Sequence, residues 1–171
     1  MSFSLYDASI PLYLQMMRNL DAILDKAAAD AATKGVEIST LLEAKLAPDM
    51  HPLARQIQMV SDGAKGGAAR LAGIEAPSMA DTETTLPELK ERLAKTIAFV
   101  EGVKREQVDG REGATIELKF PGRTMTFTGA SFLTTFSLPN FMFHVVTAYA
   151  ILRAQGAPLG KMDFLAAAQM A

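Results

Sequence analysis

Apolar residues recur at three- and four-residue steps in four long stretches of the chain, at about residues 9–35, 52–73, 85–100 and 137–155. This spacing places the apolar side chains of each stretch along one side of an α-helix. In the first stretch the apolar stripe comprises Tyr13, Met16, Met17, Leu20, Ile23, Leu24, Ala27 and Ala31. Because four such helices bury their stripes against one another, the pattern predicts a four-helix bundle.

Local signals mark where these helices begin and end. Thr85 and Glu88 stand in the order of a capping box, in which the hydroxyl and the carboxylate each bond the other residue's backbone amide. Gly35 and Gly73 are expected to stop the first two helices. Two shorter helical segments are expected, at residues 39–45 and 161–171.

Between Gly110 and Gly129 the apolar period changes from 3.6 to 2 residues. Two alternating runs flank Pro121-Gly122, a pair that favours a tight turn, and so predict a β-hairpin. The apolar members of these runs are Ile116, Leu118, Phe120, Met125 and Phe127. An isolated hairpin is only marginally stable in water, so we expect its apolar face to lie on the helices. The predicted fold is mainly all-α, a bundle with a hairpin inserted between the third and fourth helices.

The fourth helix, expected from Ser137 to Gln155, is apolar nearly all round. Such a helix is covered by several neighbours or forms a subunit interface, and we expect a homodimer. Its most apolar run, residues 141–152, is interrupted by His144 and is shorter than the roughly 20 residues that span a bilayer, which predicts no membrane partner. The first residues lack a signal-peptide pattern, so the cytoplasm is the expected location.

Composition narrows the functional classes. The 171 residues suit one globular domain, residues 1–171. A formal net charge of -2, with basic and acidic residues interleaved, argues against a nucleic-acid partner. The absence of cysteine excludes disulfides, thiolate catalysis and cysteine-ligated zinc. With two histidines, one chain cannot build a three-histidine metal site.

Several segments of the chain resemble a known family. They are Pro-Asp-Met at residues 48–50, Asp-Gly-Ala-Lys at 62–65, Phe-His-Val-Val-Thr-Ala-Tyr-Ala-Ile-Leu-Arg at 143–153, and Leu-Gly-Lys-Met-Asp-Phe-Leu at 159–165. In them the chain is similar to the uncharacterised DUF1993 family, whose fold is like that of the DinB/YfiT-like four-helix bundles. The resemblance covers almost the whole chain. It implies the bundle fold and supplies little chemistry, because the family has no established activity.

The resemblance also implies a place for a metal. Many DinB-like bundles hold a divalent cation with three histidines, one near the start of the second helix and two, four residues apart, on the fourth. His51 and His144 are placed like two of these ligands, and no second histidine stands one turn from His144. Asn140 as a weak oxygen ligand, or Asp49 or Asp62 as a carboxylate, would have to complete a reduced site.

His144 lies on the apolar fourth helix, where we expect a buried neutral ring bonded to a carbonyl or hydroxyl group. The functional alternative is a metal ligand or general base in a pocket that Thr147 and Tyr149 help to line. His51 is expected to be exposed, although the helix dipole behind it favours the neutral ring that a metal ligand needs. Asp49 is expected to cap the second helix.

Gln58, Asp62 and Lys65 project from one side of the second helix. We expect this side to be solvated, with a weak Asp62–Lys65 ion pair, and the alternative places it against a cleft or a second subunit. Three polar residues of the third helix are likewise expected to face water: Glu91, Arg92 and Lys95.

Two functional hypotheses follow. We favour a cytoplasmic helical-bundle protein that forms a homodimer and holds, at most, a small-molecule ligand in a pocket at the bundle end, without a cofactor. The alternative is a DinB-like metal-dependent enzyme of the thiol transferase or hydrolase type, in which His51 and His144 hold Zn²⁺ or Ni²⁺.

Overall fold

The computed structural model describes residues 4–165. In chain order its elements are α1 (Ile10–Lys34), α2 (Ile38–Glu43), α3 (Leu53–Ala72), α4 (Leu86–Glu101), α5 (Arg105–Val108), β1 (Thr115–Phe120), β2 (Arg123–Thr128), α6 (Gly129–Phe132), the π-helical turn η1 (Leu133–Ser137), α7 (Leu138–Ala154) and α8 (Lys161–Leu165).

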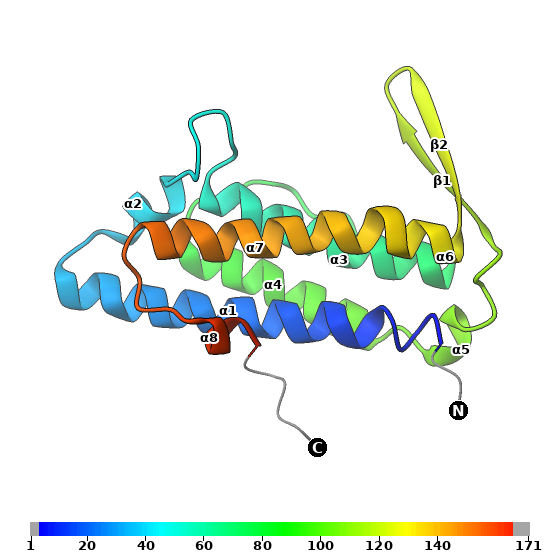
Figure 1. Ribbon diagram of the computed structural model, residues 1–171, viewed down its shortest axis with the longest axis horizontal. Helices are drawn as coiled ribbons and strands as arrows, with labels where there is room; N and C mark the ends of the chain where they lie inside the picture. The colour runs from blue at the N-terminus through cyan, green and yellow to red at the C-terminus, as the bar shows by residue number, and fades with distance from the viewer. Residues whose placement is uncertain (1–3, 166–171) are drawn as a thin grey trace.

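The helices α1, α3, α4 and α7 form the predicted four-helix bundle (Figure 1). Helix α4 packs on α1 and α3, and α7 packs on α3 and α1, so the four apolar stripes close one core. Helix α2 lies at one end of the bundle, whereas α5 and the hairpin lie at the other. The short α8 rests on α1, and the rest of the expected tail helix, residues 166–171, lies outside the described residues.

The local helix signals are confirmed. Thr85 and Glu88 form the capping box at the start of α4, with the Glu88 carboxylate accepting the Thr85 amide at 2.9 Å. Gly35 and Gly73 end α1 and α3 in the left-handed conformation that glycine adopts without strain.

The hairpin is also confirmed, and its turn end projects away from the bundle (Figure 1). Strand β1 pairs antiparallel with β2, and Gly122 turns the chain with a φ of 78°. Helix packing is concentrated near the base, where the Phe127 ring lies 6.0 Å from Phe132 and 5.8 Å from Phe136 between centroids. On β1, Ile116 and Leu118 are 6% exposed, whereas Phe120, near the turn, is 40% exposed and borders a cavity beside α3.

The last helix begins eight residues earlier than predicted, at Gly129 instead of Ser137. Helices α6 and α7 are joined without a break through η1. The prediction followed from Pro139. Proline has no backbone N–H and clashes with the carbonyl four residues before it, so it normally stands in the first turn of a helix. The π-helical turn widens the helix just before this proline, with the Leu138 amide bonded to the Leu133 carbonyl.

This continuous helix, residues 129–154, is long and apolar enough to cross a membrane by length and composition, and within residues 4–165 it is the one helix that meets that criterion. The prediction that the apolar segment is too short was therefore wrong, because residues 129–137 extend it. The core helix of a bundle meets the same criterion, and α7 packs on α3 and α1.

Candidate functional site

A cavity of about 310 Å³ lies between α3, the last helix and β1, toward the end of the bundle that carries the hairpin. Its volume is at the lower end of the range of small-molecule sites. Its apolar wall is formed by Met59, Leu118, Phe120, Phe132 and Phe136. On the α3 side Gly63 and Gly67 have no side chain to fill it.

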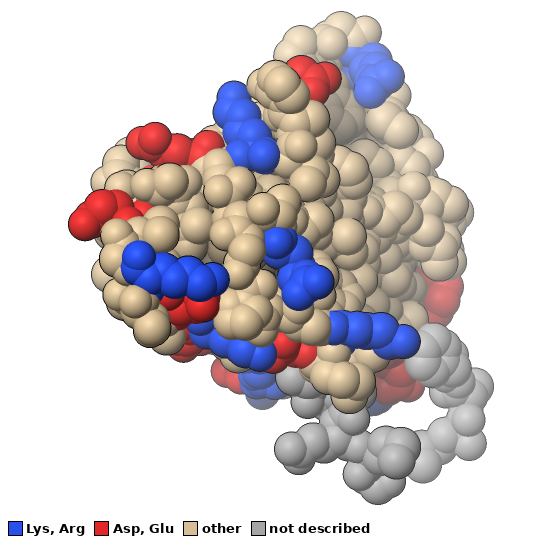
Figure 2. All heavy atoms as spheres, turned by 60° about the vertical axis from the view of Figure 1, so that its left-hand side comes forward, with Lys and Arg blue, Asp and Glu red and all other residues tan. Residues whose placement is uncertain are grey.

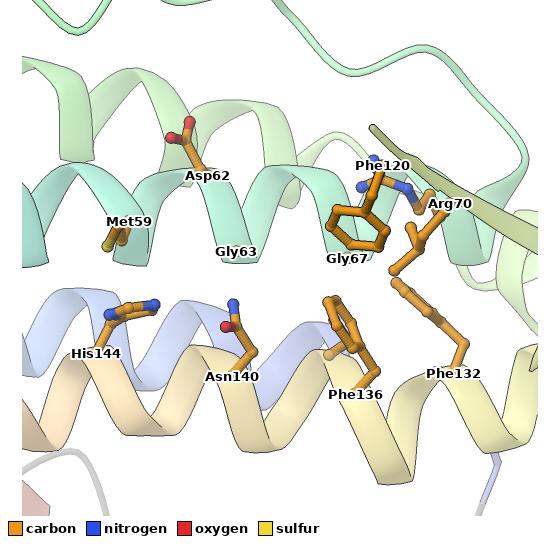
Figure 3. Close-up of a pocket in the computed structure, with 12 residues that line it drawn as sticks. Met59, Asp62, Gly63, Gly67, Arg70, Phe120, Phe132, Phe136, Asn140 and His144 are labelled. Atoms are coloured by element: carbon orange, nitrogen blue, oxygen red, sulfur yellow. The ribbon is translucent and has the colours of Figure 1, made fainter. Parts of the chain in front are cut away.

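Five polar side chains line the same cavity: Asp62, Arg70, Ser137, Asn140 and His144. Figure 3 shows His144 and Asn140 projecting from α7 toward α3, with Arg70 beside Phe120 and Phe132 at the opposite end. An apolar cavity with a few convergent polar groups is the usual form of a ligand site.

Gln56 determines how His144 presents its two ring nitrogens. The Gln56 amide nitrogen donates to the backbone carbonyl of His51 at 3.1 Å, so the amide oxygen is left to accept. That oxygen lies 2.8 Å from Nδ1 of His144, which must therefore carry the proton. The neutral ring is the Nδ1–H tautomer, and its Nε2 keeps a lone pair that accepts a hydrogen bond.

The surroundings of His144 favour this neutral ring. Burial lowers the pKa of the half-buried imidazole below its usual 6.5, and the positive charges of His51 and Arg55 lower that pKa further. At neutral pH His144 is therefore an uncharged acceptor. It can bind a donor or take up a proton, and both uses depend on the same lone pair.

A buried hydroxyl pair lies beneath the cavity. The Tyr13 hydroxyl and Ser137 Oγ are 2.7 Å apart, and burial raises the pKa of Tyr13 to about 12, so the phenol stays protonated. Gly67 makes room for them, because a Cβ at this position would lie 2.5 Å from the tyrosine oxygen. The absence of a side chain at Gly67 thus lets α3 approach Tyr13 of α1 and Ser137 of η1 closely.

The donor set does not fit the metal site that the DinB resemblance implies. Nδ1 of His144 is held by Gln56, and His51 is exposed on the segment before α3. The Asp62 carboxylate is paired with Lys65 and Arg92. Among residues 4–165 no three histidine, aspartate or glutamate side chains gather as a metal group requires.

Asp49 does not cap α3. The helix begins at Leu53 with Pro52 in the capping position, and no side chain bonds its first amides. The expectation was wrong because Asp49 lies three residues before that position, in an exposed turn. The cavity lining does not include Asp49 either.

The side of α3 expected to be solvated is covered instead. The segment between α3 and α4, residues 73–85, contacts this side: Asp81 pairs with Arg55 of α3, and Glu83 accepts from Gln58 of α3. Arg92, predicted to face water, is 2% exposed and bonds Asp62 at 2.8 Å, Asp81 at 2.9 Å and Glu83 at 3.0 Å. The apolar period of a helix shows which of its sides packs on the other helices. It does not show whether a connecting segment covers one of the remaining, polar sides.

Gln58 and Lys65 lie on this same covered side of α3. Gln58 is buried and donates to Glu83 at 3.0 Å, and Lys65 forms the expected pair with Asp62 at 2.9 Å. In Figure 3 the Asp62 side chain points away from α7. Gln58 thus bonds the connection between α3 and α4, Asp62 bonds Arg92 of α4, and of these three residues only Asp62 borders the cavity.

Thr147 and Tyr149 do not join His144 in a pocket. The Thr147 hydroxyl donates to the Phe143 carbonyl at 2.7 Å, within α7. The Tyr149 ring packs edge-on against Phe164 of α8, in a shallow depression of its own. Neither borders the α3–α7 cavity, whose lining on α7 ends at His144.

A larger hollow, about 590 Å³, lies between residues 73–85 and α4. Its rim consists largely of solvated charged groups, including Glu88, Glu91 and Lys95. Glu91 and Lys95 pair with each other at 2.7 Å. The α3–α7 cavity is the better candidate, because it combines an apolar wall with an acceptor whose geometry is fixed.

Four polar residues at or near the cavity were not predicted from the sequence as part of a site: Tyr13, Gln56, Arg70 and Ser137. A signal existed for Gln56, which lies three residues after Leu53 and four before Val60, on the buried stripe of α3. A polar residue on a buried stripe needs a buried partner. For Ser137 and Arg70 the pattern carried no comparable signal.

The fold is that of the DinB-like four-helix bundles. The crystal structure of a DinB family member protein from Shewanella denitrificans matches it with a TM-score of 0.86 and 41% identity, over 94% of this chain and 91% of that one. The chain belongs to the DUF1993 family, described as a domain of unknown function, whose model matches residues 5–165. Both resemblances inferred from the sequence are thus confirmed. No curated protein matches the chain.

Proposed function

We propose that this protein binds a small, mainly apolar molecule in the α3–α7 cavity and that Nε2 of His144 accepts a hydrogen bond from it. One observation carries the proposal: Gln56 holds His144 as the Nδ1–H tautomer at the wall of an apolar cavity. A hydrogen bond in a site of low polarity discriminates between ligands, because a ligand without the donor leaves the acceptor unpaired.

A matched pair of ligands tests the proposal. 2-Naphthol carries a hydroxyl donor, and 2-methoxynaphthalene has nearly the same shape without it. We expect fluorescence titration to show that the wild-type protein binds 2-naphthol about three- to tenfold more tightly, the difference that one net hydrogen bond makes. In His144→Phe, which keeps a ring at this position, the two should bind equally.

The comparison within each variant controls for small changes in folding, since both ligands meet the same protein. Failure of the wild type to bind 2-naphthol would contradict the proposal. So would a preference for 2-naphthol that survives in His144→Phe.

We further propose that two copies of the chain associate, in the cytoplasm, through the outer side of α7. Support comes from Phe143 and Val146, which are 55% and 47% exposed and are the large apolar side chains of that side. No charged residue occurs from Leu138 to Leu152, and Figure 2 shows a broad area of the surface without acidic or basic side chains. A side without charge can face its own copy without repulsion, as a two-fold interface requires.

A further inference from the structure

Arg70 stands at the end of the cavity opposite His144 (Figure 3). Its guanidinium donates to the Gly66 carbonyl at 2.9 Å, and among residues 4–165 it forms no ion pair with a carboxylate. An arginine has five N–H donors, so most of the donors of Arg70 are left for another partner.

The one carboxylate that borders the cavity does not satisfy Arg70. Asp62 is paired with Lys65 at 2.9 Å and with Arg92 at 2.8 Å, and its side chain points away from α7 (Figure 3). With His144 neutral, the charge that the cavity presents to a ligand is the single positive charge of Arg70.

The geometry points to a carboxylate as the group that Arg70 binds, which makes the ligand an elongated aromatic carboxylic acid with a hydrogen-bond donor at its far end. This inference rests on the proposed function. The planar fork of a guanidinium matches a carboxylate in two parallel hydrogen bonds. Arg70 is exposed to solvent, and its one positive charge balances the single charge of a carboxylate, whereas a phosphate carries nearly two negative charges.

The length of the cavity along the last helix limits the length of the ligand. Phe136 and His144 both line the cavity and stand eight residues apart on the last helix, a rise of about 12 Å for α-helical geometry. A ligand that reaches both polar ends is therefore elongated, and a fused two-ring aromatic compound is a suitable probe for the site. The rings of Phe120, Phe132 and Phe136 provide an aromatic wall for them.

Gly66 is a positioning residue for Arg70. A Cβ at this position would lie 2.6 Å from the Arg70 guanidinium nitrogen Nη1, so any side chain there forces the guanidinium to move. Because the atom displaced is the end of a flexible side chain, the fold should tolerate the change.

The test compares 6-hydroxy-2-naphthoate, which has both polar ends, with 2-naphthol, which lacks the carboxylate, in the same fluorescence titration. We expect the wild type to bind the acid at least about tenfold more tightly, the effect of hydrogen bonds to a charged group. Arg70→Gln should lose this preference and keep its affinity for 2-naphthol. Gly66→Ala should reduce the preference while its thermal unfolding stays close to that of the wild type.

Lys45→Gln provides the control for net charge. Lys45 is exposed just after α2, at the end of the bundle away from the hairpin, and its loss should leave the preference unchanged (Figure 1). If 2-naphthol binds but the acid binds no better, or if Arg70→Gln keeps the preference, the inference about Arg70 is wrong and the proposed function stands. Tighter binding of 2-naphthyl phosphate than of the acid would overturn the carboxylate class. If neither naphthol nor acid binds, both proposals fail.

Discussion

At the scale of single residues, the site depends on Gln56. Its amide is held by the His51 carbonyl, and this orientation decides which nitrogen of His144 carries the proton. From the sequence, His144 could be expected to be buried, neutral and bonded to a carbonyl, and the structure places it against the side-chain carbonyl of Gln56. The partner itself could not be identified, because nothing local indicates which residue of α3 faces position 144 of α7.

Replacing Gly67 with alanine should lower the free energy of unfolding by about 1–2 kcal/mol, since overpacking costs about 1–3 kcal/mol and the gain in helix propensity returns up to about 1 kcal/mol. The added Cβ would lie 2.5 Å from the Tyr13 hydroxyl and 2.6 Å from Ser137 Oγ, both buried. Urea unfolding followed by circular dichroism measures the change.

Gly63→Ala is the matched control on the same helix. There the new Cβ would meet Phe141 at 3.6 Å, an ordinary contact, so the variant should be as stable as the wild type or up to about 1 kcal/mol more stable. If the two alanine variants prove equally stable, the close packing of Gly67 on the Tyr13–Ser137 pair is not a determinant of stability.

At the scale of elements, most of the bundle could be predicted because its signals are local. The capping box of Thr85 and Glu88, the stops at Gly35 and Gly73, and the turn at Gly122 each act over a few residues and have the same effect in any fold. These boundaries agree with the structure to within one or two residues.

The start of the last helix could not be predicted in this way. Pro139 is a start signal in an isolated sequence, yet here it lies within a helix that continues through η1. The threonines of this turn support it, since the hydroxyls of Thr134 and Thr135 donate to carbonyls one turn back. Because η1 also carries Ser137 into the cavity wall, the irregular turn is part of the candidate site.

The connection between α3 and α4 shows a second limit. Arg92 lies on the side of α4 that periodicity assigns to water, and it is buried because Asp81 and Glu83 are brought to it by residues 73–85. Ion pairs between residues far apart in sequence have no periodic signature. The prediction of a solvated side failed for this reason at Arg92 and at Gln58.

At the scale of the whole molecule, the outer side of α7 predicts self-association. We expect sedimentation velocity to show a dimer for the wild type and a monomer for Val146→Glu, because a two-fold interface would bring two like charges together without solvent. Ala94→Glu, on an exposed position of α4, adds the same charge elsewhere and should remain dimeric. A wild-type protein that sediments as a monomer at every concentration would contradict the proposed dimer.

The central claim, that neutral His144 offers Nε2 to the cavity, is tested most directly by the imidazole nitrogen signals of protein labelled with ¹⁵N-histidine. The chain has two histidines, so His51→Asn assigns both rings. Near pH 8 we expect a protonated-type shift at Nδ1 of His144 and an unprotonated-type shift at Nε2. Because burial and nearby charge lower its pKa, this pattern should persist as the pH falls below 6.5. A His144 ring protonated at Nε2, or one that titrates at or above 6.5, would contradict the account.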